Sequence, residues 1–361
     1  MTLDPEPIYD IEKTYIENAE QGPFFNGQIP KRTRHEKYNF LGIEVSSRIG
    51  VFAGPLLNSK WIKLAAELGY DILTYKTIRS SEHAGHPLPN VVYINSENPL
   101  NPLRLPSQVV STDIEPPLKN LGITNSFGMP SRSPDYLHHD IPLSMKALSK
   151  GQALIVSITG TPGKEFSKTG YIQDFVRAAR LAETAGAPII EANFSCPNVS
   201  KDEGSLYLHP ESAFEVASAI VAAISKPLII KVGHFPDKNI LRKTLVALTC
   251  AGVKAVAGIN SVSLKVVNED GEPALGKGRL TSGICGAPIR ECALEFVTDA
   301  KYIIANEKLN LTLIGGGGIM EPSHFEDFFN AGADFAFVAT GMMWDPYLAH
   351  RYQEAYANLR S

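Results

Sequence analysis

The sequence predicts an α/β fold, a closed (β/α)8 barrel, because short apolar runs alternate with longer amphipathic ones along most of the chain. The apolar runs are brief, rich in Ile and Val, and bounded by Gly, Pro or Asn, as is typical of strands buried on both faces. Eight such runs in series favour closure over the alternative, an open doubly wound sheet. The expected strands are residues 48–53, 71–76, 153–158, 188–193, 228–232, 255–259, 311–315 and 335–339.

Helical periodicity fills the segments between these runs. Residues 172–185 carry one apolar stripe, formed by Phe175, Val176, Ala179 and Ala182. Residues 211–224 and 325–330 show similar patterns. Three glycines each follow a helical run and precede a strand, the usual place for a helix C-terminal cap: Gly186, Gly252 and Gly332.

Two stretches fall outside this alternation. Residues 1–40 form an N-terminal extension before a barrel expected to span residues 41–361, with a weak amphipathic stripe at Ile8, Ile11, Tyr15 and Ile16. The extension could pack on the barrel, form a dimer contact or lie at a membrane surface. Residues 88–122 are dense in Pro and Asn, and we interpret them as an inserted excursion near the active-site face, not as a second domain.

Composition narrows the function classes. The chain has 361 residues and a net charge of 34 − 38 = −4, so no global basic field favours nucleic acid. Its four cysteines lack the paired spacing of a zinc site or disulfide framework, which favours a reducing compartment. The sequence shows no apolar run of membrane-spanning length and no signal-peptide pattern, so a cytoplasmic protein is expected.

Chemistry-bearing residues follow several predicted strands, at the barrel end where ligands bind. The most informative segment is Asn193-Phe-Ser-Cys-Pro-Asn198, in which polar side chains follow a buried strand directly. One interpretation is a ring ligand faced by carboxamides, with Cys196 exchanging a proton. The other is a turn closed by Asn and Pro, with Cys196 as a small buried hydrophobe.

Two lysines and further carboxamides extend this pattern. Lys76 and Lys231 end strands, and a lysine inside a barrel needs an anionic partner, although either could instead extend into solvent at the rim. Asn125 and Asn260 join Asn193 and Asn198 as groups that both donate and accept hydrogen bonds, which suits a flat heterocycle.

A phosphate site is predicted after the last two strands. The Gly315–Gly318 run follows the seventh strand and Ala339-Thr340-Gly341 follows the eighth, where backbone N–H groups could hold a phosphate. The run lacks dinucleotide-fingerprint spacing, so a mononucleotide fits better.

These residues resemble the dihydroorotate dehydrogenases, particularly the soluble class that uses a cysteine. The resemblance runs from about Gly42 to Tyr352, interrupted by residues 94–120, and Asn193-x-Ser-Cys-Pro-Asn198 is its most specific element. It implies an FMN-containing barrel that oxidises dihydroorotate to orotate in pyrimidine synthesis. Cys196 would take the C5 proton of the substrate while a hydride passes to the flavin.

The resemblance also implies roles for other residues. Asn125, Asn193, Asn198, Asn260 and Ser261 would bind the substrate, and N–H groups around Gly128 and Met129 would hold its carboxylate. Lys76 would lie between flavin and substrate, and Lys231 near flavin N1. The expected FMN contacts are Ala53, Gly54, Lys76, Asn193, Lys231, Ser261, Gly286, Gly317, Gly318, Thr340 and Gly341.

Two alternatives stay open at this stage. One is a related flavoenzyme acting on another dihydropyrimidine, and the other is a barrel that binds FMN or a phosphorylated ligand without catalysis. The electron acceptor is also open among fumarate, a quinone at a membrane surface, and NAD reached through a partner subunit. We expect a homodimer with no nucleic-acid partner and no bound metal.

Overall fold

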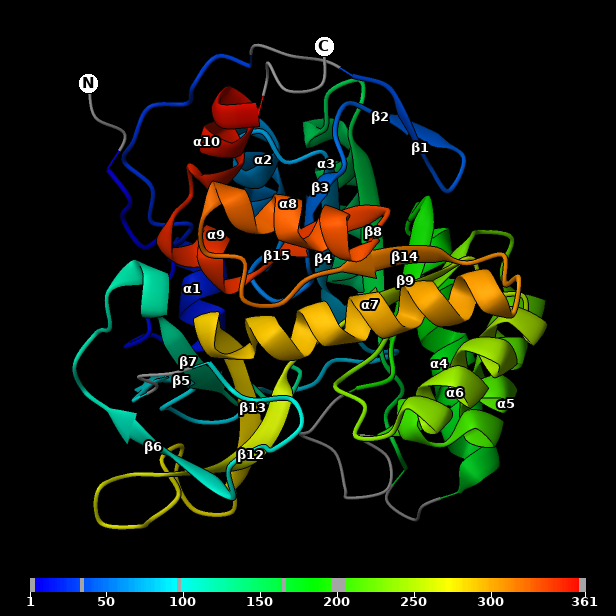
Figure 1. The fold of residues 1–361 in the computed structure, drawn as a ribbon. Helices are drawn as coiled ribbons and strands as arrows, with labels where there is room; N and C mark the ends of the chain where they lie inside the picture. Colours follow the sequence, from blue (N-terminus) through cyan, green and yellow to red (C-terminus); the bar gives the residue numbers. More distant parts are fainter. Residues whose placement is uncertain (1–3, 33–35, 96–98, 164–166, 196–204, 357–361) are drawn as a thin grey trace.

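The computed structural model describes residues 4–32, 36–95, 99–163, 167–195 and 205–356. Eight parallel strands close into a barrel and neighbour one another in chain order (Figure 1). This arrangement confirms the predicted (β/α)8 fold, and each strand overlaps a predicted run. The strands are β3 (Ile49–Val51), β4 (Ile72–Ile78), β8 (Ala153–Ile158), β9 (Ile189–Asn193), β10 (Leu228–Lys231), β11 (Ala255–Gly258), β14 (Thr312–Gly315) and β15 (Phe335–Val338).

Helices alternate with these strands and cover the outside of the barrel (Figure 1). The apolar stripe predicted within residues 172–185 is buried on α4. The helices after β3 are α2 (Ser59–Glu67), α3 (Pro134–Ala147), α4 (Lys168–Thr184), α5 (Pro210–Ala223), α6 (Lys238–Cys250), α7 (Arg290–Asn306), α8 (Pro322–Ala331), α9 (Thr340–Trp344) and α10 (Leu348–Tyr356). Short 3-10 turns are η1 (Leu118–Asn120), η2 (Leu206–Leu208) and η3 (Ala287–Ile289).

The three predicted glycine caps are confirmed. Gly186, Gly252 and Gly332 end α4, α6 and α8 with φ angles of 100°, 89° and 112°. A left-handed residue at this position lets the chain leave the helix and pair the last free carbonyls, which glycine does without a Cβ penalty.

The barrel interior is apolar at one end and polar at the other. Inside the barrel, an apolar cluster separate from the main hydrophobic core includes Ile72, Ile155, Ile189 and Ile229, which lie at the starts or middles of their strands. Side chains alternate between the two faces of a strand, so every second residue points into the barrel. Toward the C-terminal ends of the strands several of these interior residues are polar. These residues are Lys76, Ser157, Glu191, Asn193 and Lys231.

A short hairpin plugs the apolar end. It consists of β1 (Tyr38–Phe40) and β2 (Ile43–Val45). Phe40 is fully buried, and its ring lies 4.8 Å from that of Phe335 at the start of β15. The opposite, polar end of the barrel is therefore the one available for a ligand.

A second closed sheet of five strands stands on the ligand end, at the lower left of Figure 1. Two excursions build it. The excursion after β4 supplies three strands, which lie within and just beyond residues 88–122. The excursion after β11 supplies two strands within residues 262–286, a segment in which the sequence pattern predicted no strand. The strands are β5 (Val91–Ile94), β6 (Gln108–Thr112), β7 (Gly122–Asn125), β12 (Val262–Val267) and β13 (Thr281–Gly286).

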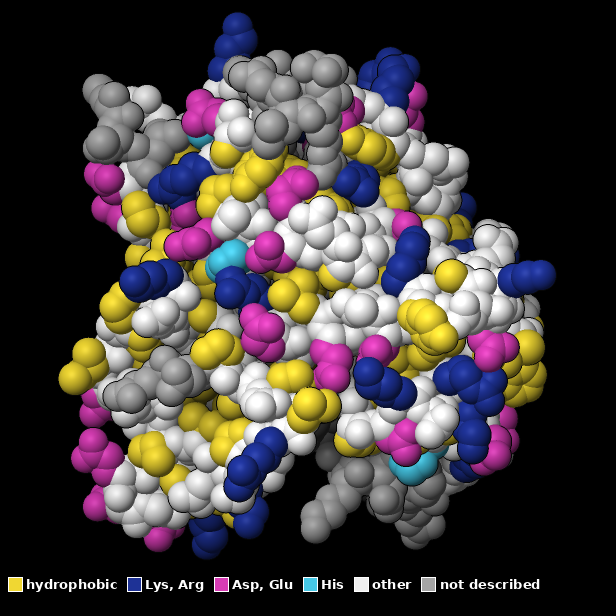
Figure 2. Space-filling view, viewed as in Figure 1, with side chains coloured by type: hydrophobic (Ala, Val, Ile, Leu, Met, Phe, Trp, Pro, Cys, Tyr) yellow, Lys and Arg dark blue, Asp and Glu magenta, His cyan; other side chains and the backbone are white. Residues whose placement is uncertain are grey.

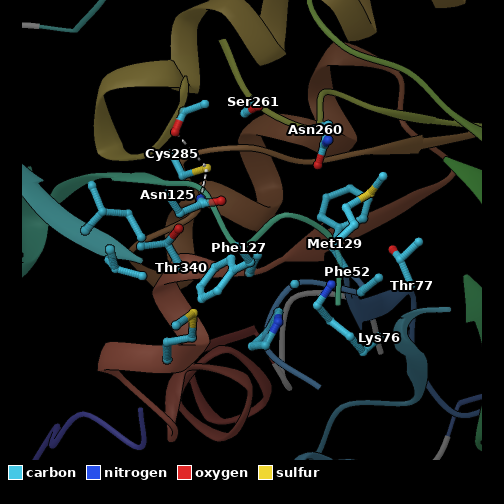
Figure 3. Close-up of a pocket in the computed structure, with 18 of the residues that line it drawn as sticks. Phe52, Lys76, Thr77, Asn125, Phe127, Met129, Asn260, Ser261, Cys285 and Thr340 are labelled. Carbon is cyan, nitrogen blue, oxygen red and sulfur yellow. Dashed lines mark hydrogen bonds between the residues drawn. The ribbon is translucent and has the colours of Figure 1, made fainter. Parts of the chain in front are cut away.

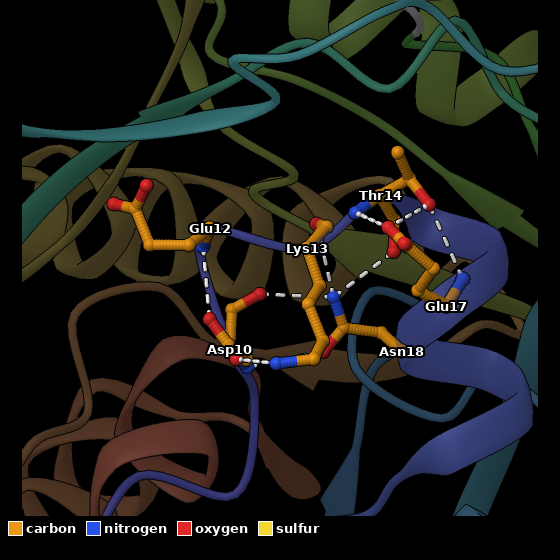
Figure 4. Close-up of polar contacts among 6 residues, drawn as sticks. All are labelled: Asp10, Glu12, Lys13, Thr14, Glu17 and Asn18. Carbon is orange, nitrogen blue, oxygen red and sulfur yellow. Dashed lines mark hydrogen bonds and ion pairs between the residues drawn. The ribbon is translucent and has the colours of Figure 1, made fainter.

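The N-terminal segment packs on the barrel. Helix α1 (Tyr15–Gln21) begins with a capping box in which Thr14 and Glu17 exchange hydrogen bonds (Figure 4). Asn18 is buried and binds the carbonyls of Asp10, Lys13 and Thr14, which fixes the approach to the helix. Of the predicted apolar stripe, Ile8 and Tyr15 are buried, whereas Ile16 is 39% exposed.

Acidic and basic side chains are interspersed on the face shown in Figure 2, as the small net charge suggests. Among the residues that the structure describes, no helix combines the length and hydropathy that a bilayer crossing needs.

Candidate active site

A cavity of about 140 Å³ lies at the C-terminal ends of the barrel strands (Figure 3). The small sheet contributes Asn125 and Cys285 to its wall, and the N-terminal segment contributes Tyr9. The predicted site residues that line it are Ala53, Gly54, Lys76, Asn125, Met129, Asn193, Lys231, Asn260, Ser261 and Thr340. Gly128, Gly286, Gly317, Gly318 and Gly341 are not among the lining residues. Cys196 and Asn198 lie outside the described residues.

Two ammonium groups face the cavity. Lys76 is 8% exposed and Lys231 is 5% exposed, so both are buried and the interpretation as rim lysines extending into solvent is wrong. The Lys76 Nζ lies 5.8 Å from the centre of the Tyr15 ring, and the Lys231 Nζ lies 4.9 Å from that of Phe52. No Asp or Glu is among the described residues lining the cavity, so the wall favours a ligand that carries or develops negative charge.

Hydrogen bonds within the protein orient the carboxamides. Asn260 donates from Nδ2 to the Ser195 carbonyl at 2.7 Å. Asn125 donates from Nδ2 to the Cys285 sulfur at 3.3 Å (Figure 3). Among the described residues, neither Oδ1 accepts a hydrogen bond, so both atoms can accept from a ligand. Asn193 is held differently, because its Oδ1 accepts from the Ser195 N–H at 3.1 Å. The wall therefore offers acceptors suited to ring N–H groups.

Cys285 is a second thiol that the sequence analysis did not assign to the site. Burial raises the pKa of its thiol to about 11, and the weaker influences of Lys231 and Asn125 oppose this shift. The thiol is therefore protonated at neutral pH. The sulfur lies within 3.9 Å of the Gly283 carbonyl, to which its S–H can donate, so its lone pairs face Asn125.

A buried arginine anchors the loop that carries Gly128 and Met129. Arg79, 4% exposed, donates from Nε to the Met129 carbonyl at 2.9 Å and from Nη1 to Thr161 Oγ1 at 2.8 Å. Its own N–H donates to Ser131 Oγ at 3.1 Å. Arg79 was not predicted from the sequence, although a charged residue three positions beyond Lys76 at a strand end is a usable signal.

Backbone donors gather beside the cavity after β14 and β15. The N–H groups of Gly317, Gly318, Thr340 and Gly341 donate no hydrogen bond within the described part of the chain. An added Cβ at Gly318, where φ is 76°, would lie 2.7 Å from Arg290 Cβ. The arrangement fits the predicted phosphate site, because unpaired N–H groups next to a helix start attract an anion.

Gly286 has a packing role. Its φ is 85°, and an added Cβ would lie 2.2 Å from the Leu121 carbonyl oxygen. The requirement for glycine therefore comes from the close approach of the end of β13 to the residue just before β7.

Several further lining residues were not predicted, among them Tyr9, Phe127 and Thr77. Tyr9 is 4% exposed, and its hydroxyl has no hydrogen-bond partner among the described residues. The Phe127 ring packs edge-on against it with centroids 6.2 Å apart, and Thr77 also faces the cavity. Sequence periodicity marks such residues only as core. Within the described ranges, no group of three or more His, Cys, Asp or Glu side chains is placed to hold a metal ion.

Comparison of the sequence with known proteins shows the family of this chain. Residues 36–356 match the family described as dihydroorotate dehydrogenase. The chain is 47% identical over 360 residues to the dihydroorotate dehydrogenase of Dictyostelium discoideum, covering 96% of each chain. It is 27% identical over 239 residues to the catalytic subunit of dihydroorotate dehydrogenase B (NAD(+)) from Bacteroides thetaiotaomicron, covering 66% of this chain and 72% of that protein. The chain therefore belongs to the dihydroorotate dehydrogenase family.

Proposed function

We propose that this protein is an FMN-dependent dihydroorotate dehydrogenase of the cysteine-using class, which oxidises dihydroorotate to orotate in pyrimidine synthesis. The observation that carries the proposal is one cavity wall made by Lys76, Lys231, Asn125, Asn193 and Asn260, without an acidic lining residue among those described. Buried cations and fixed carboxamides suit an anionic, flat ring that carries N–H groups.

The residues present fit FMN. The N–H groups of Gly317, Gly318, Thr340 and Gly341 would hold its phosphate, and Lys231 would face the part of the ring where reduction places negative charge. When bound, FMN supplies the hydride acceptor that no side chain of the chain provides.

The chain's own residues would bind and orient the substrate. Asn125 and Asn260 present Oδ1 atoms to its ring N–H groups, because their Nδ2 atoms are already engaged. The loop at Gly128 and Met129, held by Arg79, would receive the substrate carboxylate on its N–H groups. Holding the ring at several points fixes its reacting carbon relative to the base.

Cys196 is the proposed base, on the strength of its match to the family motif. A thiol with an ordinary pKa of about 8.5 can act as a base near neutrality if neighbouring cations favour its thiolate. Cys285 does not suit this role, because burial raises the pKa of its thiol to about 11.

Paired cysteine variants test the proposal. Cys196→Ala should retain bound flavin and lose nearly all conversion of dihydroorotate to orotate near neutral pH. Cys285→Ser is the matched control, because its hydroxyl can still accept from Asn125, and it should retain most of the turnover. Product formation is followed by orotate absorbance, and flavin content by release on denaturation. Full activity in Cys196→Ala would remove the proposed base, whereas a protein that takes up no FMN would remove the enzyme assignment.

Reoxidation experiments on the same purified protein identify its electron acceptor. Relatives named as the catalytic subunit of dihydroorotate dehydrogenase B (NAD(+)) are connected to NAD by that name. Reoxidation rates measured with fumarate, with a short-chain quinone and with NAD compare the candidates directly. Rapid reoxidation by fumarate or quinone alone would show that this chain needs no partner subunit for turnover.

A further inference from the structure

Glu191 is a fully buried carboxylic side chain directly beneath the candidate site. It is 0% exposed and lies on the interior face of β9, between Ile189 in the apolar cluster and Asn193 in the cavity wall. Neither of its carboxyl oxygens has a hydrogen-bond partner of ordinary geometry among the described residues. The reaction proposed above gives this group no task.

Among the described residues, the charged group that acts on Glu191 is Lys231. On β8 the paired residue is Ser157, and on β10 it is Ile229, with Lys231 two residues further along the same face. Burial raises the pKa of Glu191, attraction to Lys231 opposes this shift, and Ser157 opposes it more weakly. The other buried lysine, Lys76, lies against the Tyr15 ring.

Lys231 is therefore shared between two sites. It balances Glu191 inside the barrel, and it also lines the cavity where the ligand binds. While the ligand beside it is neutral, one ammonium compensates one carboxylate. When that ligand gains a negative charge, Lys231 lies between two anions, and a second anion near a fully buried carboxyl group raises the pKa of that group.

We propose that Glu191 is a redox-linked proton acceptor, which binds one proton when flavin in the cavity is reduced and releases it on reoxidation. The proposal rests on the function proposed above. The substrate's C6 hydride carries two electrons and one proton equivalent to the flavin, and its C5 proton leaves through the base. The proton bound by Glu191 comes from solvent and converts its carboxylate to a carboxylic acid. Glu191 acts through Lys231, so it is a positioning residue that balances charge.

The pH dependence of flavin reduction tests this proposal. The midpoint potential is measured by dithionite titration, without substrate, across about pH 5 to 9, a range that begins just above the ordinary glutamate pKa. With two protons per two electrons, the reduction equilibrium falls 100-fold per pH unit. With one proton per two electrons, the equilibrium constant falls tenfold per pH unit. A tenfold change corresponds to about 30 mV for a two-electron couple, so the two-proton slope is about 59 mV and the one-proton slope about 30 mV per pH unit.

Wild type should show the two-proton slope over at least one pH unit, and Glu191→Gln should show the one-proton slope throughout. Ser157→Ala is the matched control, because it removes the neighbouring hydroxyl and keeps the carboxyl group, and it should retain the steeper slope. A one-proton slope in wild type across the whole range overturns the proposal, whether or not the variant folds.

Infrared spectroscopy gives an independent measurement on wild type. The reduced-minus-oxidised difference spectrum should gain the carbonyl band of a protonated carboxyl group, and Glu191→Gln should lack that band. Absence of the band in wild type also overturns the proposal. The two hypotheses fail separately. A protein without flavin removes the proposed function, whereas a flavin-bound protein with a one-proton slope removes only the role of Glu191.

Discussion

Replacing Arg79 tests whether the loop at Gly128 and Met129 binds the substrate carboxylate. The guanidinium joins this loop to Thr161 through hydrogen bonds of 2.9 and 2.8 Å. Arg79→Met keeps much of the apolar volume but removes both bonds. The Met129 carbonyl then loses its charged donor, and the loop must be ordered by substrate binding itself.

The expected effect follows from the bond to Met129. A hydrogen bond to a charged group contributes about 1.5–3 kcal/mol, and each 1.4 kcal/mol corresponds to about a tenfold change in affinity. The KM for dihydroorotate should therefore rise by about 10- to 100-fold. The kcat should change less, because the loop contacts the carboxylate and not the reacting carbons.

The assay is steady-state oxidation of dihydroorotate with flavin content measured in parallel. Arg79→Lys is the matched control, because a single ammonium keeps the charge but cannot reach both partners in the planar fork of arginine. Its KM should lie between those of wild type and Arg79→Met. An unchanged KM in a folded, flavin-containing Arg79→Met protein would refute the role given to this loop.

Two further predictions follow from the glycine cradle and the second thiol. Gly318→Ala should lower both the melting temperature and the amount of flavin retained, because φ at this residue is 76° and the new Cβ would lie 2.7 Å from Arg290. Gly278→Ala is the control for backbone strain alone, because φ is 84° there and no atom lies within 4 Å of the new Cβ. This control variant should retain its flavin. Cys285 is partly buried, and its labelling by iodoacetamide is followed by mass spectrometry. The labelling rate should increase with pH through pH 10, because the thiolate reacts and the pKa of the thiol is raised to about 11. A plateau below pH 9 would contradict this raised pKa.

The barrel could be predicted from sequence because each of its strands is buried on both faces. Such strands leave short runs of Ile and Val that stand out against the helices between them. The strand β13 (Thr281–Gly286) leaves no comparable run, since it is rich in small residues and pairs with β7, more than 150 positions earlier in the chain. Its pairing depends on tertiary structure that local periodicity does not record.

The site residues likewise divide into those that could be predicted from the sequence and those that could not. Lys76, Lys231 and Asn193 could be predicted because polar groups at the ends of buried strands are conspicuous. Glu191 is a single acid within a strand, and only the register between β9 and β10 places it beside Lys231 on the interior face. Cys285 becomes a site residue only through the fold of the small sheet, which brings it to Asn125.

The most direct test of the central claim is anaerobic mixing of the purified, yellow protein with dihydroorotate. Hydride transfer to bound FMN should bleach the flavin absorbance in a single turnover, with one orotate formed per flavin. Dihydrouracil, which lacks the carboxylate that the loop at Gly128 and Met129 would bind, should leave the flavin oxidised on the same timescale. Bleaching by dihydrouracil but not by dihydroorotate would contradict the assigned substrate.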